Sequence, residues 1–155
     1  MPSPRWSLVP ASYVYLVRDQ QVLLQLRRNT GYLDDHWVAG AAGHVEAGET
    51  ARGCAVRELR EELGVRVHPS ALTPLTVMQR TDGTTDPLEQ RVDWFFTADG
   101  WTGTPRAMEP QKCAEIRWFP LARLPDPMPE YEHRVLTGLR SGELPMFTAH
   151  GFEEH

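Results

Sequence analysis

The chain has 155 residues, 41% of them hydrophobic and 24% charged, and a net charge of −5. This length and composition fit one globular domain over residues 1–155. It has no Lys/Arg-rich block, no apolar run of membrane-spanning length and no signal-peptide pattern, so we expect a cytoplasmic protein that binds neither nucleic acid nor membranes. Cys54 and Cys113 lie in apolar-patterned segments and are expected to be buried thiols, not a disulfide.

The expected elements follow one another without a repeat or a domain linker. Two β-rich runs separated by Asp19 and Gln20 predict a hairpin. Thr50 is the expected N-cap of the first helix and Gly64 its stop, while Gly142 ends the last helix. In chain order we predict strands at 12–18, 21–27 and 37–42, a helix at 50–63, strands at 65–68, 72–80, 91–97 and 113–119, and a helix at 130–140. Strands before, between and after two helices predict an α/β fold with a mixed sheet between helices.

The helix predicted at 50–63 has an acidic and an apolar face. The acidic face consists of Glu58, Glu61 and Glu62, and the apolar face of Val56, Leu59 and Leu63. The three carboxylates repel one another and oppose the helix dipole, because they lie in the C-terminal half of the helix. An acidic face is usually solvated, but converging carboxylates beside small residues also suit Mg²⁺ or Mn²⁺. The spacing alone leaves both interpretations open.

The residues around the acidic face distinguish these interpretations. Residues 43–65 read GHVEAGETARGCAVRELREELGV, which is Gly, five residues, Glu, seven residues, then Arg-Glu-aliphatic-any-Glu-Glu-any-Gly-aliphatic. This segment resembles the Nudix box at every defining position, a match that arises by chance on the order of once in 10⁹ windows. The resemblance implies a Nudix α/β/α sandwich with a mixed central sheet. It also implies a metal-dependent hydrolase that splits a diphosphate bond in a small phosphorylated substrate.

The same resemblance implies a metal site on the box helix. Glu58 and Glu62 correspond to direct ligands of Mg²⁺ (or Mn²⁺), one helical turn apart. Glu61 corresponds to a further ligand, through water or to a second ion, and the Gly43 carbonyl to a main-chain ligand. Such a cluster would neutralise the acidic face, attract an anionic substrate to an acidic protein and activate water for attack on phosphorus.

Catalytic groups are implied inside and outside the box. Arg57 resembles the family arginine that orients the carboxylates, and Glu49 resembles the loop acid that supports them. The general base has three candidates: Glu109 comes first, Glu89 second, and Glu61 acting through water is the third.

Basic residues outside the box are candidates for binding phosphate oxygens. Arg27 and Arg28 end a predicted strand whose tip could face the metal, although an ordinary polar strand end fits them equally well. Lys112 lies in residues 108–113, which resemble the Glu-Pro-x-Lys-Cys segment of some nucleoside-triphosphate Nudix enzymes; a surface loop is the alternative interpretation. The Leu-Pro-Gly-Gly that often precedes the box is replaced by Val-Ala-Gly-Ala-Ala at 38–42, so this loop indicates no substrate class.

Aromatic and histidine residues are expected to be structural. Trp37, Trp94 and Trp118 lie in or next to predicted strands, where aromatic side chains mostly enter the core rather than stack on a base. His36 and His44 flank the box loop and are expected to be solvated.

The leading functional hypothesis is hydrolysis of a nucleoside triphosphate, unmodified or oxidised, to the monophosphate and pyrophosphate. Alternatives are hydrolysis of ADP-ribose, a nucleotide sugar or another nucleoside diphosphate derivative, and a non-catalytic ligand-sensing domain. Isopentenyl-diphosphate isomerases share the fold but need a catalytic cysteine and a longer chain, and neither Cys54 nor Cys113 suits that role. The oligomeric state stays open, with a homodimer through an edge strand or the N-terminal segment as one form.

Overall fold

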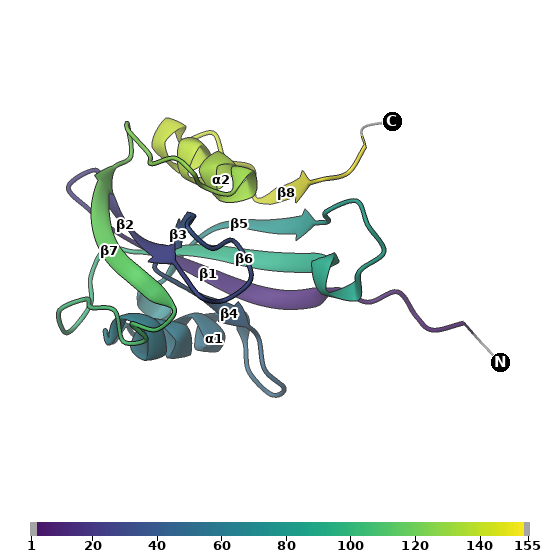
Figure 1. Ribbon diagram of the computed structural model, residues 1–155, viewed down its shortest axis with the longest axis horizontal. Coiled ribbons are helices and arrows are strands. Elements are labelled where there is room, and N and C mark those ends of the chain that lie inside the picture. Colours follow the sequence, from purple (N-terminus) through teal and green to yellow (C-terminus); the bar gives the residue numbers. More distant parts are fainter. Residues whose placement is uncertain (1–2, 154–155) are drawn as a thin grey trace.

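A twisted sheet lies between two helices in the computed structural model, which describes residues 3–153 (Figure 1). Helix α1 (Ala51–Glu58) covers one face of the sheet and helix α2 (Glu130–Ser141) covers the other, so the predicted α/β/α sandwich is confirmed. The strands are β1 (Val9–Arg18), β2 (Gln21–Arg27), β3 (Trp37–Ala39), β4 (Ala41–His44), β5 (Thr73–Arg80), β6 (Arg91–Ala98), β7 (Cys113–Pro120) and β8 (Phe147–His150). Within the described range, no helix has both the length and the apolar character needed to cross a membrane.

The sheet is mixed, as predicted. Its main path has the order β3-β2-β1-β6-β5-β8, with β4 beside β1 and β7 beside β2. β1 runs parallel to β6, from Val9 opposite Arg91 to Leu16 opposite Ala98, and β5 runs parallel to β8. The other strand pairs are antiparallel. β1 therefore joins the two halves of the sheet, because its middle pairs with β4 and its end with β2.

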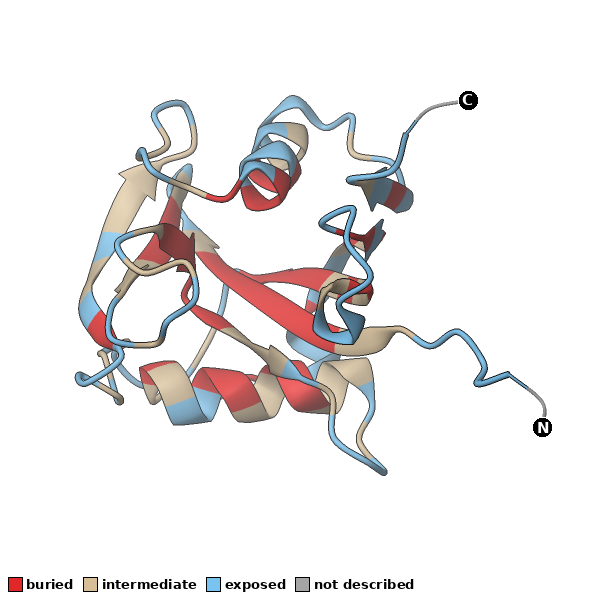
Figure 2. Ribbon diagram, turned by 45° about the vertical axis from the view of Figure 1, so that its right-hand side comes forward, coloured by how far each residue is buried: buried red, intermediate tan, exposed pale blue. Residues whose placement is uncertain are grey.

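Two apolar layers form on the two faces of β1, because successive side chains of a strand point to opposite sides. Tyr13 and Tyr15 enter a buried cluster that includes residues of α2. Val14 and Leu16 enter a second cluster that includes residues of α1. Figure 2 shows this buried centre between the two helices, whose outer sides are exposed. The sheet is thus covered on both faces, which fixes both helices against it.

The sheet has one more break and one more strand than the sequence predicts. The strand expected at 37–42 is two short strands separated at Gly40, where the backbone passes close to the box helix. A Cβ added at Gly40 would lie 2.9 Å from Leu63 Cδ1. β8 was not predicted, because only Thr148 is buried in it and Phe147 is 72% exposed, so it lacks a strong apolar pattern.

The strand expected at 65–68 is wrong. Val65 and Val67 are buried, which explains the apolar alternation that suggested a strand. Only Arg66 pairs with another segment, through a single bridge to Thr102. A short 3-10 helix that begins at Pro69 follows immediately, so the pairing does not extend.

Candidate active site

The box helix has a regular beginning and an irregular end. Thr50 caps α1, as predicted, by accepting a hydrogen bond from the Gly53 amide at 2.9 Å. After Glu58 the helix widens into a π turn over Leu59–Leu63, and Gly64 ends this turn with a φ of 69°. Both leucines of the turn are buried, as expected for the apolar face. Such π turns change the direction of neighbouring side chains and are frequent at functional sites.

The three carboxylates of the acidic face have different surroundings. Glu62 Oε2 accepts a hydrogen bond from the Ala42 amide of β4 at 2.9 Å. Glu58 is buried against the same strand, and a Cβ added at Gly43 would lie 2.2 Å from Glu58 Oε1. Only glycine therefore leaves room for this carboxylate. Glu61 keeps 47% of its side chain exposed, so Glu58 and Glu62 face β4 while Glu61 lies at the surface.

Arg57 joins the acidic groups of the box. Its Nε and Nη2 donate to the two Glu49 oxygens at 2.8 and 3.0 Å. Its Nη1 donates to Glu58 at 2.7 Å and to Glu61 at 3.2 Å, and its Nη2 also reaches the His44 carbonyl at 3.1 Å. The hydrogen bonds from Arg57 lower the pKa of Glu49 to about 2, and those to Glu49 raise the pKa of Arg57. Arg57 thus holds both a loop acid and the helix carboxylates in one arrangement.

Two carboxyl groups of the box, those of Glu58 and Glu62, are destabilised in their charged forms. Burial, and then the charge of Glu58, raise the pKa of Glu62 to about 8. Burial also raises the pKa of Glu58, although Arg57 opposes this rise. The charge of Glu109 adds to the rise at both carboxyl groups. A divalent cation between these groups would restore their carboxylate forms.

The donor atoms around Glu62 fit part of a magnesium coordination sphere. Among residues 3–153, no three His, Cys, Asp or Glu side chains form a complete metal cage. Mg²⁺ rarely uses such a cage, because it keeps several waters and takes one or two carboxylates together with substrate phosphates. Glu58 and Glu62 supply two carboxylates. The Gly43 carbonyl, which accepts a hydrogen bond from Cys54 Sγ at 3.4 Å, supplies a third oxygen facing the same helix.

A small cavity of about 140 Å³ lies beside Glu62. Its wall includes Arg27, Thr30, Glu109, Lys112 and Cys113. Lys112 Nζ lies 3.7 Å from Glu109 Oε2, so this base candidate has a cation at its side. Arg28 is not part of the wall; its guanidinium donates to the Pro110 carbonyl, with Nε at 2.9 Å. The structure thus brings Arg27, Glu109 and Lys112 together beside Glu62, whereas Arg28 anchors the loop that carries Glu109.

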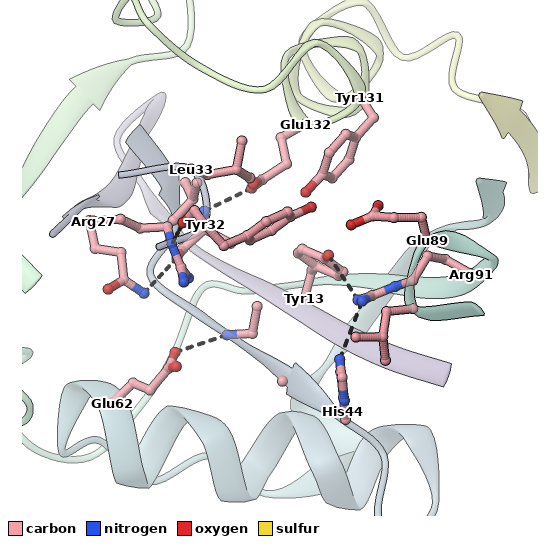
Figure 3. Close-up of a pocket in the computed structure, with 16 residues that line it drawn as sticks. Tyr13, Arg27, Tyr32, Leu33, His44, Glu62, Glu89, Arg91, Tyr131 and Glu132 are labelled. Atoms are coloured by element: carbon pink, nitrogen blue, oxygen red, sulfur yellow. Dashed lines mark hydrogen bonds between the residues drawn. The ribbon is translucent and has the colours of Figure 1, made fainter. Parts of the chain in front are cut away.

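A larger cavity of about 360 Å³ shares Gln25, Arg27 and Glu62 with the small one. Figure 3 shows Glu62 entering it from the side of α1, and Tyr131 entering it from α2. Glu62 therefore lies where the small cavity, which contains basic residues, meets the larger cavity, which extends toward α2.

Two other predicted positions line the larger cavity. His44 Nε2 lies 3.2 Å from Arg91 Nη1, and burial, followed by the charge of Arg91, lowers the pKa of His44. Glu89 lies 4.0 Å from Arg80 Nη1, and Figure 3 shows it across the cavity from Glu62. Of the two base candidates outside the box, Glu109 rather than Glu89 shares the small cavity with Glu62.

The aromatic side chains of the larger cavity are tyrosines, which no sequence pattern indicated as site residues. Tyr13 lies in β1, Tyr32 in the loop between β2 and β3, and Tyr131 in α2, so no local spacing in the sequence connects them. Trp37 is buried in the core and contacts Phe119 with ring centroids 4.7 Å apart, whereas Trp94 and Trp118 are partly buried and pack against the core. None of these three tryptophans lines either cavity beside Glu62, which agrees with the expected structural role. His36, in the turn after β2, has Nδ1 3.0 Å from the Asp34 carbonyl oxygen.

The family of the chain follows from comparison with known proteins. The family model described as the NUDIX domain matches residues 7–139. A solved MutT NUDIX hydrolase from Burkholderia pseudomallei is similar with a TM-score of 0.74 and 26% identity, over 84% of this chain and 97% of that chain. The chain belongs to the Nudix hydrolase family, as its box predicts.

Relatives within the family differ in what they act on. An isopentenyl-diphosphate Delta-isomerase from Jannaschia sp. (strain CCS1) is 34% identical over 112 residues, which are 72% of this chain and 63% of that protein. The NAD-capped RNA hydrolase NudC from Stutzerimonas stutzeri (strain A1501) is 29% identical over 118 residues, which are 76% of this chain and 38% of that protein. The chain thus spans less than two thirds of the length of either relative.

Proposed function

We propose that the chain hydrolyses a diphosphate bond in a nucleoside triphosphate, unmodified or modified, to give the nucleoside monophosphate and pyrophosphate. The observation that carries this proposal is the position of Glu62 between the two cavities. A phosphate chain beside Glu62 meets the basic side chains of Arg27 and Lys112, while the rest of the nucleotide extends into the tyrosine-lined cavity. The acidic net charge of −5 disfavours the approach of such an anionic substrate, and a bridging cation would offset this.

The box residues fit a site for Mg²⁺ (or Mn²⁺). Glu58, Glu62 and the Gly43 carbonyl would hold the ion, with Glu61 as a further ligand through water. When bound, the ion stabilises charge on the phosphate oxygens and lowers the pKa of a coordinated water. Arg57 keeps Glu58 in position through its 2.7 Å hydrogen bond, and the same guanidinium is itself fixed by Glu49.

Side chains outside the box complete the proposed site. Glu109 accepts the proton of the attacking water, because it is the carboxylate that shares the small cavity with Glu62. Arg27 and Lys112 donate to phosphate oxygens of the substrate. Arg28 acts through the backbone, since its hydrogen bonds to the Pro110 carbonyl hold the loop on which Glu109 lies.

The isomerase relatives raise a second candidate, conversion of an isopentenyl diphosphate. A catalytic cysteine reacts best as a thiolate. Burial raises the pKa of Cys54 to about 11, and its thiol donates to the carbonyls of Gly43 and His44. Burial also raises the pKa of Cys113, whose thiol donates to the Glu115 carbonyl at 3.2 Å. Burial thus disfavours the thiolate form of both cysteines, which favours hydrolysis over cysteine-dependent isomerisation.

A substrate panel tests the proposal. The purified chain would be incubated with nucleoside triphosphates, an 8-oxo-purine triphosphate, ADP-ribose, a nucleotide sugar, a dinucleotide and isopentenyl diphosphate, each with Mg²⁺ or with EDTA. Pyrophosphate and a monophosphate from a triphosphate, formed only with Mg²⁺, is the expected result. Two monophosphate products from ADP-ribose or a nucleotide sugar, with no pyrophosphate from any triphosphate, would replace the proposed substrate class. Cleavage that EDTA leaves unchanged would contradict the metal site.

A further inference from the structure

A buried carboxylate lies at one end of the larger cavity, where α2 forms the wall. Glu132, in the first turn of that helix, is 1% exposed and lines the cavity. Figure 3 shows Glu132 and Tyr131 reaching in from α2, on the opposite side of the cavity from Glu62. The cavity thus has a phosphate end at the box helix and a second polar group at its far side.

Only one of the two Glu132 carboxylate oxygens is used within the protein. Oε1 accepts hydrogen bonds from the Tyr15 hydroxyl and from the Ala39 amide, both at 2.7 Å. No group in residues 3–153 donates a hydrogen bond to Oε2. Every fully enclosed side-chain nitrogen or oxygen in that range has a partner, so Oε2 is not sealed within the protein. It opens into the cavity, where a ligand can donate to it.

The cations on this side of the cavity are engaged elsewhere. Arg80 donates its Nε to Asp93 at 2.9 Å, and its guanidinium lies 3.8 Å from the centroid of the Tyr131 ring. Arg91 lies 3.4 Å from the other Asp93 oxygen. Burial raises the pKa of Glu132 to about 7, although the hydrogen bonds from Tyr15 and Ala39 and the charge of Arg80 oppose this rise. A donor from a ligand would therefore stabilise this group.

We propose that Glu132 Oε2 selects the base of the substrate by accepting a hydrogen bond from an exocyclic amino group of that base. This inference rests on the proposed function, because it takes the phosphate chain to lie at Glu62. Tyr32 lines the same cavity, is 43% exposed and offers a ring face on which a base can stack. An isoprenyl chain has no N–H donor and would leave Oε2 unpaired in a dehydrated cavity.

Binding of matched nucleoside monophosphates tests this directly. AMP and purine riboside monophosphate differ only in the 6-amino group, and GMP and IMP differ only in the 2-amino group. Their affinities for the whole chain would be measured by calorimetry without metal at pH 8.5, where Glu132 is ionised. In at least one pair the amino-bearing member should bind about tenfold or more tightly, since a buried acceptor left without its donor is costly.

The variant Glu132→Gln keeps the shape of the side chain, replaces one carboxylate oxygen by an amide nitrogen and removes the negative charge. Its amide oxygen still accepts from Tyr15 and Ala39, while an amide nitrogen that donates replaces Oε2. The preference for the amino-bearing nucleotide should disappear or reverse. Glu130→Gln, with the same charge change at an exposed position of the same helix, should keep the preference.

Circular dichroism would show whether Glu132→Gln is folded; if it is not, the wild-type comparison of the two pairs decides alone. The inference is overturned if neither pair differs by more than about twofold in the wild type, or if folded Glu132→Gln keeps the preference. Tighter binding of isopentenyl monophosphate than of every nucleotide would also overturn it. Binding is measured without metal and without turnover. Failure of the chain to hydrolyse nucleotides would therefore refute the proposed function, while the difference in affinity between the members of each pair could still be measured.

Discussion

Replacement of Glu62 by glutamine separates the proposed metal-binding role of this residue from its effect on folding. Burial and the neighbouring Glu58 raise the pKa of Glu62 from 4.5 to about 8. At about 1.36 kcal/mol per pKa unit, the carboxylate form destabilises the metal-free fold by at most about 5 kcal/mol, and by less because the side chain is partly exposed. The pKa of Glu62 is higher in the folded than in the unfolded chain. Below pH 4.5 the group is protonated in both states and the fold keeps its full stability, and this stability is lost as the pH rises from 4.5 to about 8.

Glu62→Gln should remove this loss, because an amide is neutral throughout and its oxygen can still accept from the Ala42 amide. We expect the variant to be about 2–5 kcal/mol more stable than wild type at pH 8.5 in EDTA, and equally stable near pH 4.5, by urea denaturation. Mg²⁺ should stabilise the wild type but not the variant, which should also lack turnover. Glu143→Gln, an exposed change of the same charge, is the control and should show no gain. Equal free energies of unfolding for Glu62→Gln and wild type at pH 8.5 in EDTA, as near pH 4.5, would contradict the destabilising effect of the Glu62 carboxylate.

Three further substitutions test the neighbouring groups. Gly43→Ala places a Cβ 2.2 Å from Glu58 Oε1, so kcat should fall about 100-fold; a change within twofold would contradict the close approach. Arg57→Lys cannot reproduce the fork that binds Glu49 and Glu58, so thermal melting should show a loss of about 1–3 kcal/mol, and unchanged melting would count against it. Glu109→Gln should lower kcat about 10²- to 10⁴-fold, and nearly normal kcat would exclude Glu109 as the base.

The parts of the site inside the box could be predicted because chemistry and backbone geometry restrict both residue type and spacing. Thr50 and Gly64 mark the two ends of the box helix through an N-cap and a positive φ, and the structure has both. Arg57 is four residues before Glu61 and next to Glu58, so a single helix brings these groups together. Local sequence is sufficient for such features.

The remainder depends on packing between distant segments. Glu61 is exposed and Glu62 accepts from the Ala42 amide of β4, a difference that depends on how the box helix packs on that strand. Glu132 meets Tyr15 and Ala39 only because α2 packs on the sheet, across 117 and 93 residues of chain. No spacing in the sequence connects residues that far apart, so the side of the larger cavity that is formed by α2 could not be identified from the sequence alone.

In the proposed reaction, carboxylates of the box hold a metal ion and water attacks a diphosphate phosphorus of a nucleotide. The most direct measurement is hydrolysis of nucleoside triphosphates in ¹⁸O-labelled water, followed by mass spectrometry and ³¹P NMR of the products. We expect a monophosphate and pyrophosphate, formed only with a divalent cation, with one ¹⁸O in one of the two products, and no reaction with Glu62→Gln. Absence of diphosphate cleavage in every nucleotide, together with isomerisation of isopentenyl diphosphate without release of pyrophosphate, would contradict it.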